Sequence, residues 1–270
     1  MPEGHTLHRL ADDLTAAFGG RTVRSSSPQG RFAAEAARLD GRVLESADAV
    51  GKHLFVSFVD VPEQVHVHLG LYGSFVASPG TQRPVVGQVR WRLESDVTAD
   101  LRGPNACELL TPPEIDAIAA RLGPDPLRDD SDPDRAWARI HRSSTPIAAL
   151  LMDQKVLAGV GNVYRAEILY RHRVAPMTAG RRIPRTRWDA MWQDLRGLMR
   201  EGVRTGRIDT VRPEHEPEAM GREPRADDHG GEVYVYRRDG LPCLVCGTTV
   251  RRREVAGRNL FWCPSCQQRR

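Results

Sequence analysis

The sequence contains almost no lysine. Of its 39 Lys and Arg residues, only Lys52 and Lys155 are lysines. Arginine stays charged, whereas a lysine amine can lose its proton and react, so the two residue types are not interchangeable. A chain with this bias would keep a lysine where it needs an amine. Both lysines are therefore candidates for chemistry, and chance retention is the competing explanation for each.

Long hydrophobic runs are also missing. The mean hydropathy is −0.46, no stretch of 18 apolar residues occurs, and the first residues lack the basic and then apolar order of a signal peptide. These absences argue against a membrane-spanning or secreted protein. We expect a soluble, cytoplasmic protein with no membrane partner.

Cysteine is scarce and unevenly placed. Cys107 stands alone and is interpreted as a buried thiol, while the other four cysteines form two Cys-x-x-Cys pairs near the C-terminus. In a cytosolic chain such pairs indicate metal binding before disulfide formation. Cys243-x2-Cys246 and Cys263-x2-Cys266 are separated by sixteen residues, which is the spacing of a structural zinc site. Four thiolates would leave no open position for a catalytic water, so we expect one structural Zn²⁺ between two short strands, 250–254 and 259–262.

Length and charge set further bounds. A chain of 270 residues can form two domains, and its net charge of +4 with a pI near 9.0 conceals a clustering of arginine. Nine arginines lie between positions 181 and 212, against four acidic residues, and three more occupy 251–253. A polyanion such as nucleic acid is the partner that these clusters favour, although a compositional bias toward arginine would produce them too.

The first 122 residues read as a β-rich domain that begins with a helix. Apolar residues recur at helical spacing over 6–18, and two glycines follow. Alternating strands are then expected at 42–50, 53–59, 64–69, 74–77 and 88–93, separated by turn residues, which predicts an antiparallel sandwich or flattened barrel. His66 and His68 share a strand face in this reading and are interpreted as ordinary strand residues.

A helical domain is predicted for residues 123–231. The segment 121–134 is rich in proline and aspartate and forms the best domain boundary. Helices are expected at 134–141, at 147–153 with Thr145 as N-cap, at 163–171 and at 186–205. Residues 212–231 show no periodicity and are expected to form a mobile loop. A third domain, the zinc finger, would span 232–270 and open with a strand at 232–237.

Pro2 and Glu3 are the most informative pair at the N-terminus. After removal of Met1, Pro2 would be a free secondary amine and a candidate nucleophile whose adduct with an aldehydic carbon is a permanent cation. Glu3 would supply a carboxyl group next to it for proton transfer. Many proteins carry Pro and an acidic residue at these positions without using them, so the pair is weak evidence when taken alone.

Other candidate residues lie on turns and helix starts. Lys52 falls at a hairpin turn that could aim it into a cleft or leave it solvated. Leu71 and Tyr72 form a tip between two strands that could be buried packing or a wedge for a base stack. Asn162 opens a helix whose backbone N–H groups could hold a phosphate, and Arg258 lies on the turn of the finger, where it could contact phosphate or solvent alone.

Six motifs along the chain resemble, in order, those of the formamidopyrimidine-DNA glycosylase and endonuclease VIII family. They are Pro2-Glu3-Gly4, Gly51-Lys52 with Leu54, Leu71-Tyr72-Gly73, Arg-Leu-Gly-Pro-Asp at 121–125, Gly-Val-Gly-Asn-Val-Tyr at 159–164 with Glu167, and Gly257-Arg258 ahead of Phe-Trp-Cys-Pro at 261–264. The resemblance covers nearly the whole chain. It implies an α+β multidomain fold with a leading helix, an N-terminal β-sandwich, a helix-two-turns-helix domain and a C-terminal four-cysteine zinc finger.

The resemblance also implies roles for individual residues. Pro2 would attack the sugar C1′ of a flipped damaged nucleotide, Glu3 would protonate the ring oxygen, and Lys52 would donate a proton and contact phosphate during β-elimination. Arg258 is the position that the family associates with δ-elimination. A guanidinium with a pKa above about 12 releases protons reluctantly, which makes phosphate binding its more credible part.

The remaining implied contacts are with DNA. Arg121 and Asn162 match DNA-binding positions, and Leu71 with Tyr72 would fill the space that a flipped base leaves. The implied function is a monomeric, bifunctional DNA glycosylase and AP lyase of base excision repair, located at the nucleoid, acting on damaged double-stranded DNA without a small-molecule cofactor.

Three departures from the family pattern are present, and the third of them bears on the branch. His5-Thr6 stands where the family usually has Pro-Glu, and Gly70 stands where endonuclease VIII has a glutamine before its Leu-Tyr wedge. The phenylalanine finger of the 8-oxoguanine enzymes is missing from residues 101–104. We therefore favour the endonuclease VIII branch, with oxidised pyrimidines as substrates and β,δ-elimination. An 8-oxoguanine glycosylase and a non-catalytic damaged-DNA-binding protein are the alternatives.

Overall fold

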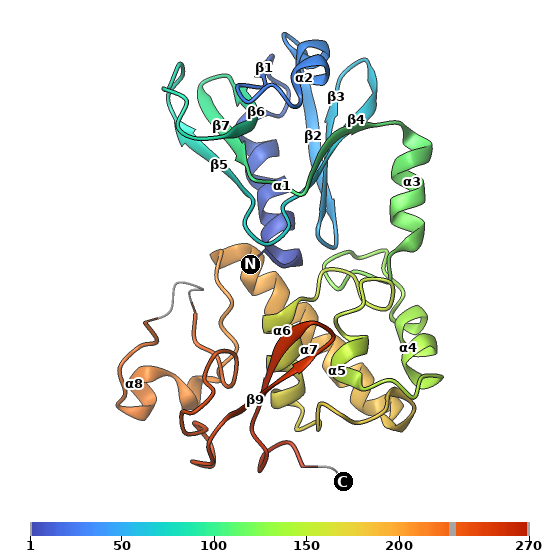
Figure 1. The fold of residues 1–270 in the computed structure, drawn as a ribbon, viewed down its shortest axis with the longest axis vertical. Coiled ribbons are helices and arrows are strands. Elements are labelled where there is room, and N and C mark those ends of the chain that lie inside the picture. Colours follow the sequence, from blue (N-terminus) through green and yellow to red (C-terminus); the bar gives the residue numbers. More distant parts are fainter. Residues whose placement is uncertain (1, 227–230, 269–270) are drawn as a thin grey trace. The chain divides into compact units, whose positions relative to one another are not determined.

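The chain forms two compact units, Met1–Arg121 and Leu122–Arg270, in a computed structural model that describes residues 2–226 and 231–268 (Figure 1). None of the described helices is both long and apolar enough to cross a membrane. The predicted α+β multidomain class is confirmed, while the finer division of the second unit into a helical domain and a finger stays a prediction.

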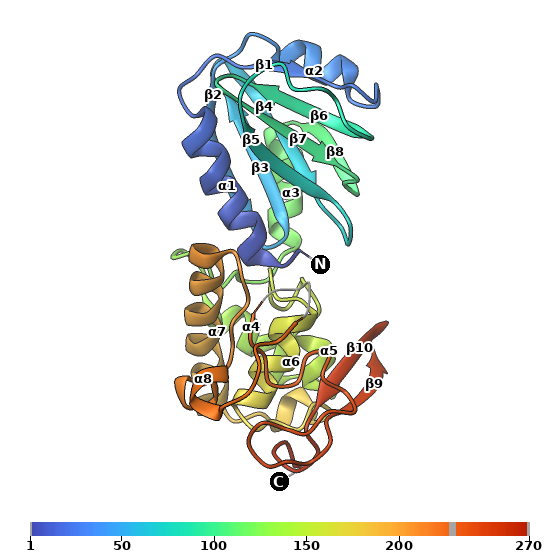
Figure 2. The same cartoon turned by 90° about the vertical axis from the view of Figure 1, so that its left-hand side faces the viewer.

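The first unit is a β-sandwich with helices at its edges (Figure 2). Its two antiparallel four-stranded sheets have the orders β1-β6-β7-β5 and β2-β3-β4-β8. Their bounds are β1 (Arg24–Ser26), β2 (Leu44–Val50), β3 (His53–Phe58), β4 (Val61–His68), β5 (Ser74–Pro79), β6 (Val89–Glu94), β7 (Val97–Arg102) and β8 (Ala106–Leu110), and the helices are α1 (Gly4–Phe18), α2 (Ala33–Leu39) and α3 (Pro112–Arg121). Buried residues from both sheets and from α1 form one core, which includes Leu7, Leu54, Val67 and Trp91.

The second unit is built around α6 (Asn162–Arg171), in which every residue from Asn162 to Tyr170 is buried. Around it lie α4 (Pro133–His141), α5 (Ile147–Leu150), η1 (Gly180–Arg182), α7 (Arg185–Thr205), η2 (Pro213–His215), α8 (Pro217–Met220) and the hairpin β9 (Arg251–Val255) and β10 (Arg258–Trp262). The apolar side of α7, with Trp188 and Trp192, packs into the same core as α6. The apolar residues that recur with a period of 3.6 along this part of the sequence therefore form the side of α7 that faces the core.

Several elements differ from the sequence-based prediction. The helix expected at 147–153 ends at Leu150, and Pro146, not Thr145, is its N-cap residue. The helix α3 was not predicted, although Thr111 and Glu114 carry the capping-box pattern, and the backbone N–H of Thr111 donates to the Glu114 carboxylate at 2.9 Å. Strands β1, β7 and β8 and helix α2 were also missed.

The strand expected at 232–237 is wrong, because a buried carboxylate takes the hydrogen bonds that a neighbouring strand would have taken. Glu167 on α6 is fully buried and accepts bonds from the backbone N–H groups of Tyr234, Val235 and Tyr236 at 2.7 to 2.8 Å. The hydroxyl of Thr210 donates to it as well, at 2.6 Å. Thr210 and Tyr234, the residues on either side of the segment 211–233, are thus both hydrogen-bonded to Glu167. The described part of this segment includes η2 and α8.

We predict that Glu167→Gln lowers the free energy of unfolding of the second unit by about 3 kcal/mol, since an amide nitrogen would face N–H donors in a buried site. Chemical denaturation followed by tryptophan fluorescence measures this. Glu201→Gln, which changes an exposed carboxylate paired with Arg204, is the matched control and should stay within about 0.5 kcal/mol of the wild type. An equally small effect of Glu167→Gln would contradict the anchoring role.

Candidate functional site and metal centre

Pro2 and Glu3 lie directly before the first helix. Glu3 is the N-cap residue of α1, with extended backbone angles (φ −117°, ψ 179°), and its carbonyl accepts a hydrogen bond from the N–H of Thr6 at 2.9 Å. Its side chain is fully buried, whereas Pro2 is partly exposed. The start of a helix favours negative charge, so this position suits a carboxylate that must stay close to a reacting group.

Lys52 lies in a two-residue hairpin turn between β2 and β3. Val50 pairs with His53 across the turn, and Gly51 has φ +61°, the conformation that glycine adopts most readily at the first turn position. Lys52 is partly buried.

Two histidines and a glutamate form a hydrogen-bonded chain next to Lys52, and a third histidine packs against it. Nδ1 of His53 lies 2.9 Å from Nε2 of His66, and Nδ1 of His66 lies 3.0 Å from the Glu108 carboxylate. The ring centroids of His53 and His68 are 5.1 Å apart. The pKa of His53 is lowered to about 3, mainly by burial and then by electrostatic interaction with His66, His68, Arg121 and Lys52 in that order.

When His66 is neutral, these hydrogen bonds fix the tautomer of His53. An ionised Glu108 only accepts, so Nδ1 of His66 donates to it and Nε2 of a neutral His66 accepts from Nδ1 of His53. Nε2 of His53 therefore remains an acceptor. Lys52 and Arg121, two residues singled out from the sequence, both act electrostatically on this one uncharged ring. His66, which is interpreted from the sequence as an ordinary strand residue, links His53 to Glu108 through these hydrogen bonds.

Leu71 and Tyr72 lie at an exposed tip between β4 and β5. The side chain of Tyr72 is 91% exposed and that of Leu71 39%, and the turn is closed by a hydrogen bond from the N–H of Gly73 to the carbonyl of Leu69 at 3.0 Å. Buried packing, one of the two interpretations of this tip, does not hold for Tyr72. A large aromatic ring held out in solvent has the form of a wedge.

Asn162 and Arg258 are placed by a buried arginine of α6. Asn162 begins α6, is 5% exposed, and donates from Nδ2 to the carbonyl of Asn259 at 2.9 Å. Arg165 is fully buried, donates to the side chain of Asn162 and contacts the carbonyls of Val255 and Asn259 at 3.2 and 3.3 Å.

These two carbonyls flank the turn of the β9–β10 hairpin. Ala256 and Gly257 fill its two central positions with φ of +53° and +68°, and Arg258 follows on the exposed side. Arg165 therefore holds both sides of the turn that presents Arg258. The sequence contained only a weak signal for this role, since Arg165 and Glu167 are the two charged residues on the otherwise largely apolar stretch 163–170.

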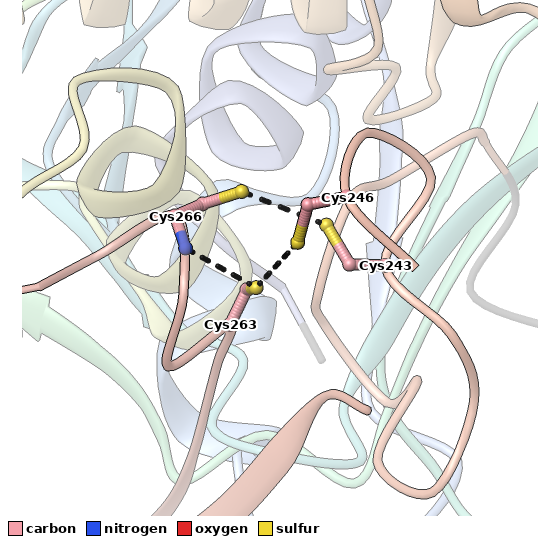
Figure 3. Close-up of side chains that lie close together, drawn as sticks. All are labelled: Cys243, Cys246, Cys263 and Cys266. Atoms are coloured by element: carbon pink, nitrogen blue, oxygen red, sulfur yellow. Dashed lines mark hydrogen bonds between the residues drawn. The ribbon is translucent and has the colours of Figure 1, made fainter. Parts of the chain in front are cut away.

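The four cysteines of the finger converge as predicted (Figure 3). Their Sγ atoms all lie within 4.8 Å of one another, with Cys243 and Cys266 3.9 Å apart and Cys246 and Cys263 3.5 Å apart. A tetrahedral zinc with bonds of about 2.3 Å requires sulfur–sulfur distances of about 3.8 Å. Among the described residues, no other group of three or more His, Cys, Asp and Glu side chains has metal-binding geometry.

The hydroxyl of Tyr170 on α6 supports this metal centre. It lies 3.0 Å from Sγ of Cys243, and burial raises the pKa of the phenol, so it remains a donor toward the thiolate. The finger is therefore joined to α6 by a hydrogen bond to one of the zinc ligands and by the packing of Phe261 into the same core. The site fits a closed, structural Zn²⁺.

Comparison with known proteins gives the family. Three family models match in chain order: the formamidopyrimidine-DNA glycosylase N-terminal domain at residues 1–106, the formamidopyrimidine-DNA glycosylase H2TH domain at 122–213, and the zinc finger found in FPG and IleRS at 240–269. "Endonuclease 8 1" of Mycobacterium tuberculosis is 53% identical over 275 residues and covers 99% of this chain and 100% of its own.

The chain belongs to the formamidopyrimidine-DNA glycosylase and endonuclease VIII family, in the endonuclease VIII branch. It is a DNA glycosylase of base excision repair. A more distant relative, "Formamidopyrimidine-DNA glycosylase" of Thermus thermophilus, is 31% identical and covers 99% of this chain and 97% of its own. The fold matches that of MutM in complex with DNA containing carbocyclic 8-oxo-G, with a TM-score of 0.79, 18% identity, and coverage of 99% and 100%.

We predict that Cys246→Ser glycosylase loses its zinc and its affinity for duplex DNA while the β-sandwich stays folded, because the metal sits wholly in the second unit. Metal analysis and hydrogen exchange in β2–β8 measure the two effects. Cys107→Ser, at a buried thiol outside the finger, is the control that should keep one zinc per chain. Full zinc content in the Cys246→Ser protein would refute the four-thiolate site.

We also predict that Arg165→Lys weakens DNA binding through Arg258, since one ammonium cannot hold both carbonyls. Each of Arg258→Ala and Arg165→Lys should lower the slope of log K against log salt by about 1, and the double variant should lower it no further. Arg204→Lys, an exposed residue paired with Glu201, tests for a general effect of arginine removal. Additive effects of Arg165→Lys and Arg258→Ala would show that Arg165 does not act through the turn.

Proposed function

We propose that this glycosylase is bifunctional, excising oxidised pyrimidines from duplex DNA and then nicking the strand at the resulting abasic site by β,δ-elimination. The observation that carries the proposal is the adjacency of Pro2, a secondary amine once Met1 is removed, and Glu3, a fully buried carboxyl at the start of α1. A nucleophile with a proton donor one residue away is what formation of a sugar iminium requires.

The excision step would proceed on the C1′ carbon of a nucleotide flipped from the helix. The nitrogen of Pro2 forms a bond to C1′ and loses its proton, while the bond from C1′ to the base breaks and the base leaves with the electron pair. Glu3 then protonates the ring oxygen O4′, the C1′–O4′ bond breaks, and an iminium between Pro2 and the opened sugar results.

The lyase steps would follow from the acidity that this iminium gives to the sugar protons. Loss of a proton from C2′ expels the 3′ phosphate from C3′, loss of a proton from C4′ then expels the 5′ phosphate from C5′, and water finally releases the sugar fragment from Pro2. Lys52 is the group proposed to move protons and hold phosphate in these steps. The neutral ring of His53 beside it adds no competing positive charge.

DNA would be held by cations and distorted by the tip. Arg121, Asn162 and Arg258 are proposed to contact phosphates, with Asn162 using the second N–H of an amide that already donates to Asn259. Leu71 and Tyr72 are proposed to fill the vacated stack, which their exposure supports. The chemistry needs neither a second subunit nor a small-molecule cofactor, and its substrate would put the enzyme at the nucleoid.

Two further candidates remain for the substrate and the activity. The identity of 53% to an endonuclease 8 and of 31% to a formamidopyrimidine-DNA glycosylase favours oxidised pyrimidines over 8-oxoguanine. A non-catalytic DNA-binding protein is disfavoured by the joint presence of Pro2, Glu3 and Lys52.

Borohydride trapping tests the nucleophile. Reduction during incubation with abasic duplex should yield a covalent protein–DNA adduct that mass mapping places on Pro2, because only three amines are available and an α-amino group is far less protonated at pH 7 than a lysine. Lys52→Ala should cleave more slowly yet still be trapped. An adduct on Lys52 or Lys155, or full trapping with Met1 retained, would refute the proline mechanism.

The same trap on single-lesion duplexes tests the substrate. Thymine glycol and 5-hydroxycytosine should give adducts at least about tenfold faster than 8-oxoguanine paired with cytosine, if the pyrimidine assignment is correct. Lys155→Ala, at the other lysine, is the control and should match the wild type. Faster trapping on 8-oxoguanine would contradict the proposed preference for oxidised pyrimidines.

A further inference from the structure

The exposed tip of the first unit is made of two chain connections. Strand β4 pairs with β8 in one sheet, with His68 opposite Ala106, and β5 pairs with β7 in the other, with Ser74 opposite Arg102. The connection from β4 to β5 (residues 69–73) and that from β7 to β8 (103–105) both pass from one sheet to the other. Because β4 is the neighbour of β8 and β5 is the neighbour of β7, the two connections begin and end on neighbouring strands. The N–H of Asn105 donates to the carbonyl of His68 at 2.8 Å, which fastens the two connections together.

The side chain of Asn105 lies against Gly70, the residue directly before the wedge. The Oδ1, Cγ and Nδ2 atoms of Asn105 all lie within 2.7 Å of the position that a Cβ of residue 70 would take. Gly70 also has φ +69°, a conformation that disfavours most side chains. A glycine here leaves the space to the carboxamide of Asn105, which is exposed next to Leu71 and Tyr72.

We propose that Asn105 is a specificity-determining residue that contacts the base opposite the lesion, and that Gly70 is small in order to admit it. The inference rests on the proposed use of Leu71 and Tyr72 as the wedge. A base whose partner has been flipped out exposes its hydrogen-bonding edge beside the wedge, where unpaired polar atoms are costly. The exposed carboxamide of Asn105 lies against Gly70, the residue that directly precedes the wedge.

The chemistry of a carboxamide predicts how this contact discriminates. It presents one acceptor and one donor side by side, and rotation by 180° exchanges them. Asn105 can therefore bond to the paired donor and acceptor of any of the four bases, and the protein should tolerate each of them opposite the lesion. A carboxylate in the same place could only accept, and would favour guanine, which offers two adjacent donors.

Binding to a duplex that contains a tetrahydrofuran abasic-site analogue tests this without any catalysis. The wild-type Kd should vary by less than about threefold among adenine, guanine, cytosine and thymine opposite the analogue. In Asn105→Asp the ratio of the Kd for thymine to that for guanine should rise about tenfold. Gln82→Glu, which adds the same charge at an exposed position beyond the other end of β6, is the matched control and should leave the ratio unchanged.

Two further variants show whether the contact is made by the group that lies over Gly70. Adding Gly70→Ala to Asn105→Asp should abolish the guanine preference, because the new Cβ takes the space of the carboxylate. The double variant Gly70→Asp with Asn105→Gly should recover it, since aspartate tolerates this backbone conformation and returns the carboxylate to the tip.

The outcomes separate this inference from the proposed function. If Asn105→Asp changes the Kd for all four opposite bases by the same factor, Asn105 only supports the turn and the inference is overturned. If borohydride trapping fails while the Kd ratio shifts as expected, the proposed chemistry is wrong and the role of Asn105 in recognition stands. A guanine preference that survives Gly70→Ala in the Asn105→Asp background would also overturn it.

Discussion

Two opposite charges buried on one short helix hold the second unit together. Arg165 and Glu167 on α6 are both fully buried, and removing such charges from water is costly unless hydrogen bonds replace the lost hydration. The structure supplies those bonds almost entirely from backbone groups of segments remote in sequence. Glu167 binds the stretch 234–236, and Arg165 binds the carbonyls on either side of the finger turn. The hydrogen bonds that offset the cost of burying these two charges are therefore the same bonds that hold residues 234–236 and the turn of the finger in place.

This arrangement explains which features the sequence could reveal. The zinc cluster, the helix α7 and the central strands depend on local spacing, and the four cysteines and the helical stripe with Trp188 and Trp192 were predicted from it. The strand expected at 232–237 failed because its N–H groups bond to a carboxylate 67 to 69 positions away. Alternation of apolar residues reports burial but does not say which acceptor a backbone N–H will meet.

The candidate site was accessible from the sequence only in part, for a similar reason. Pro2, Glu3 and Lys52 could be recognised because their neighbours along the chain carry the information. His66 and Asn105 could not, since their roles depend on side chains brought close by sheet pairing: His66 on β4 meets His53 of β3 and Glu108 of β8, and Asn105 meets Gly70 across two connections. The absence of a glutamine at position 70 was visible in the sequence, but what occupied its space was not.

The bias toward arginine also acquires a physical meaning in the folded protein. Arg165 serves as a buried, multivalent donor to several carbonyls, a role in which a lysine would satisfy fewer acceptors. The two lysines differ from each other. Lys155 is exposed in the segment before α6, whereas Lys52 is partly buried in a tight turn next to His53, whose pKa is lowered to about 3 chiefly by burial. Of the two surviving lysines, therefore, Lys52 is the one proposed for proton transfer, and chance retention is the better explanation for the exposed Lys155.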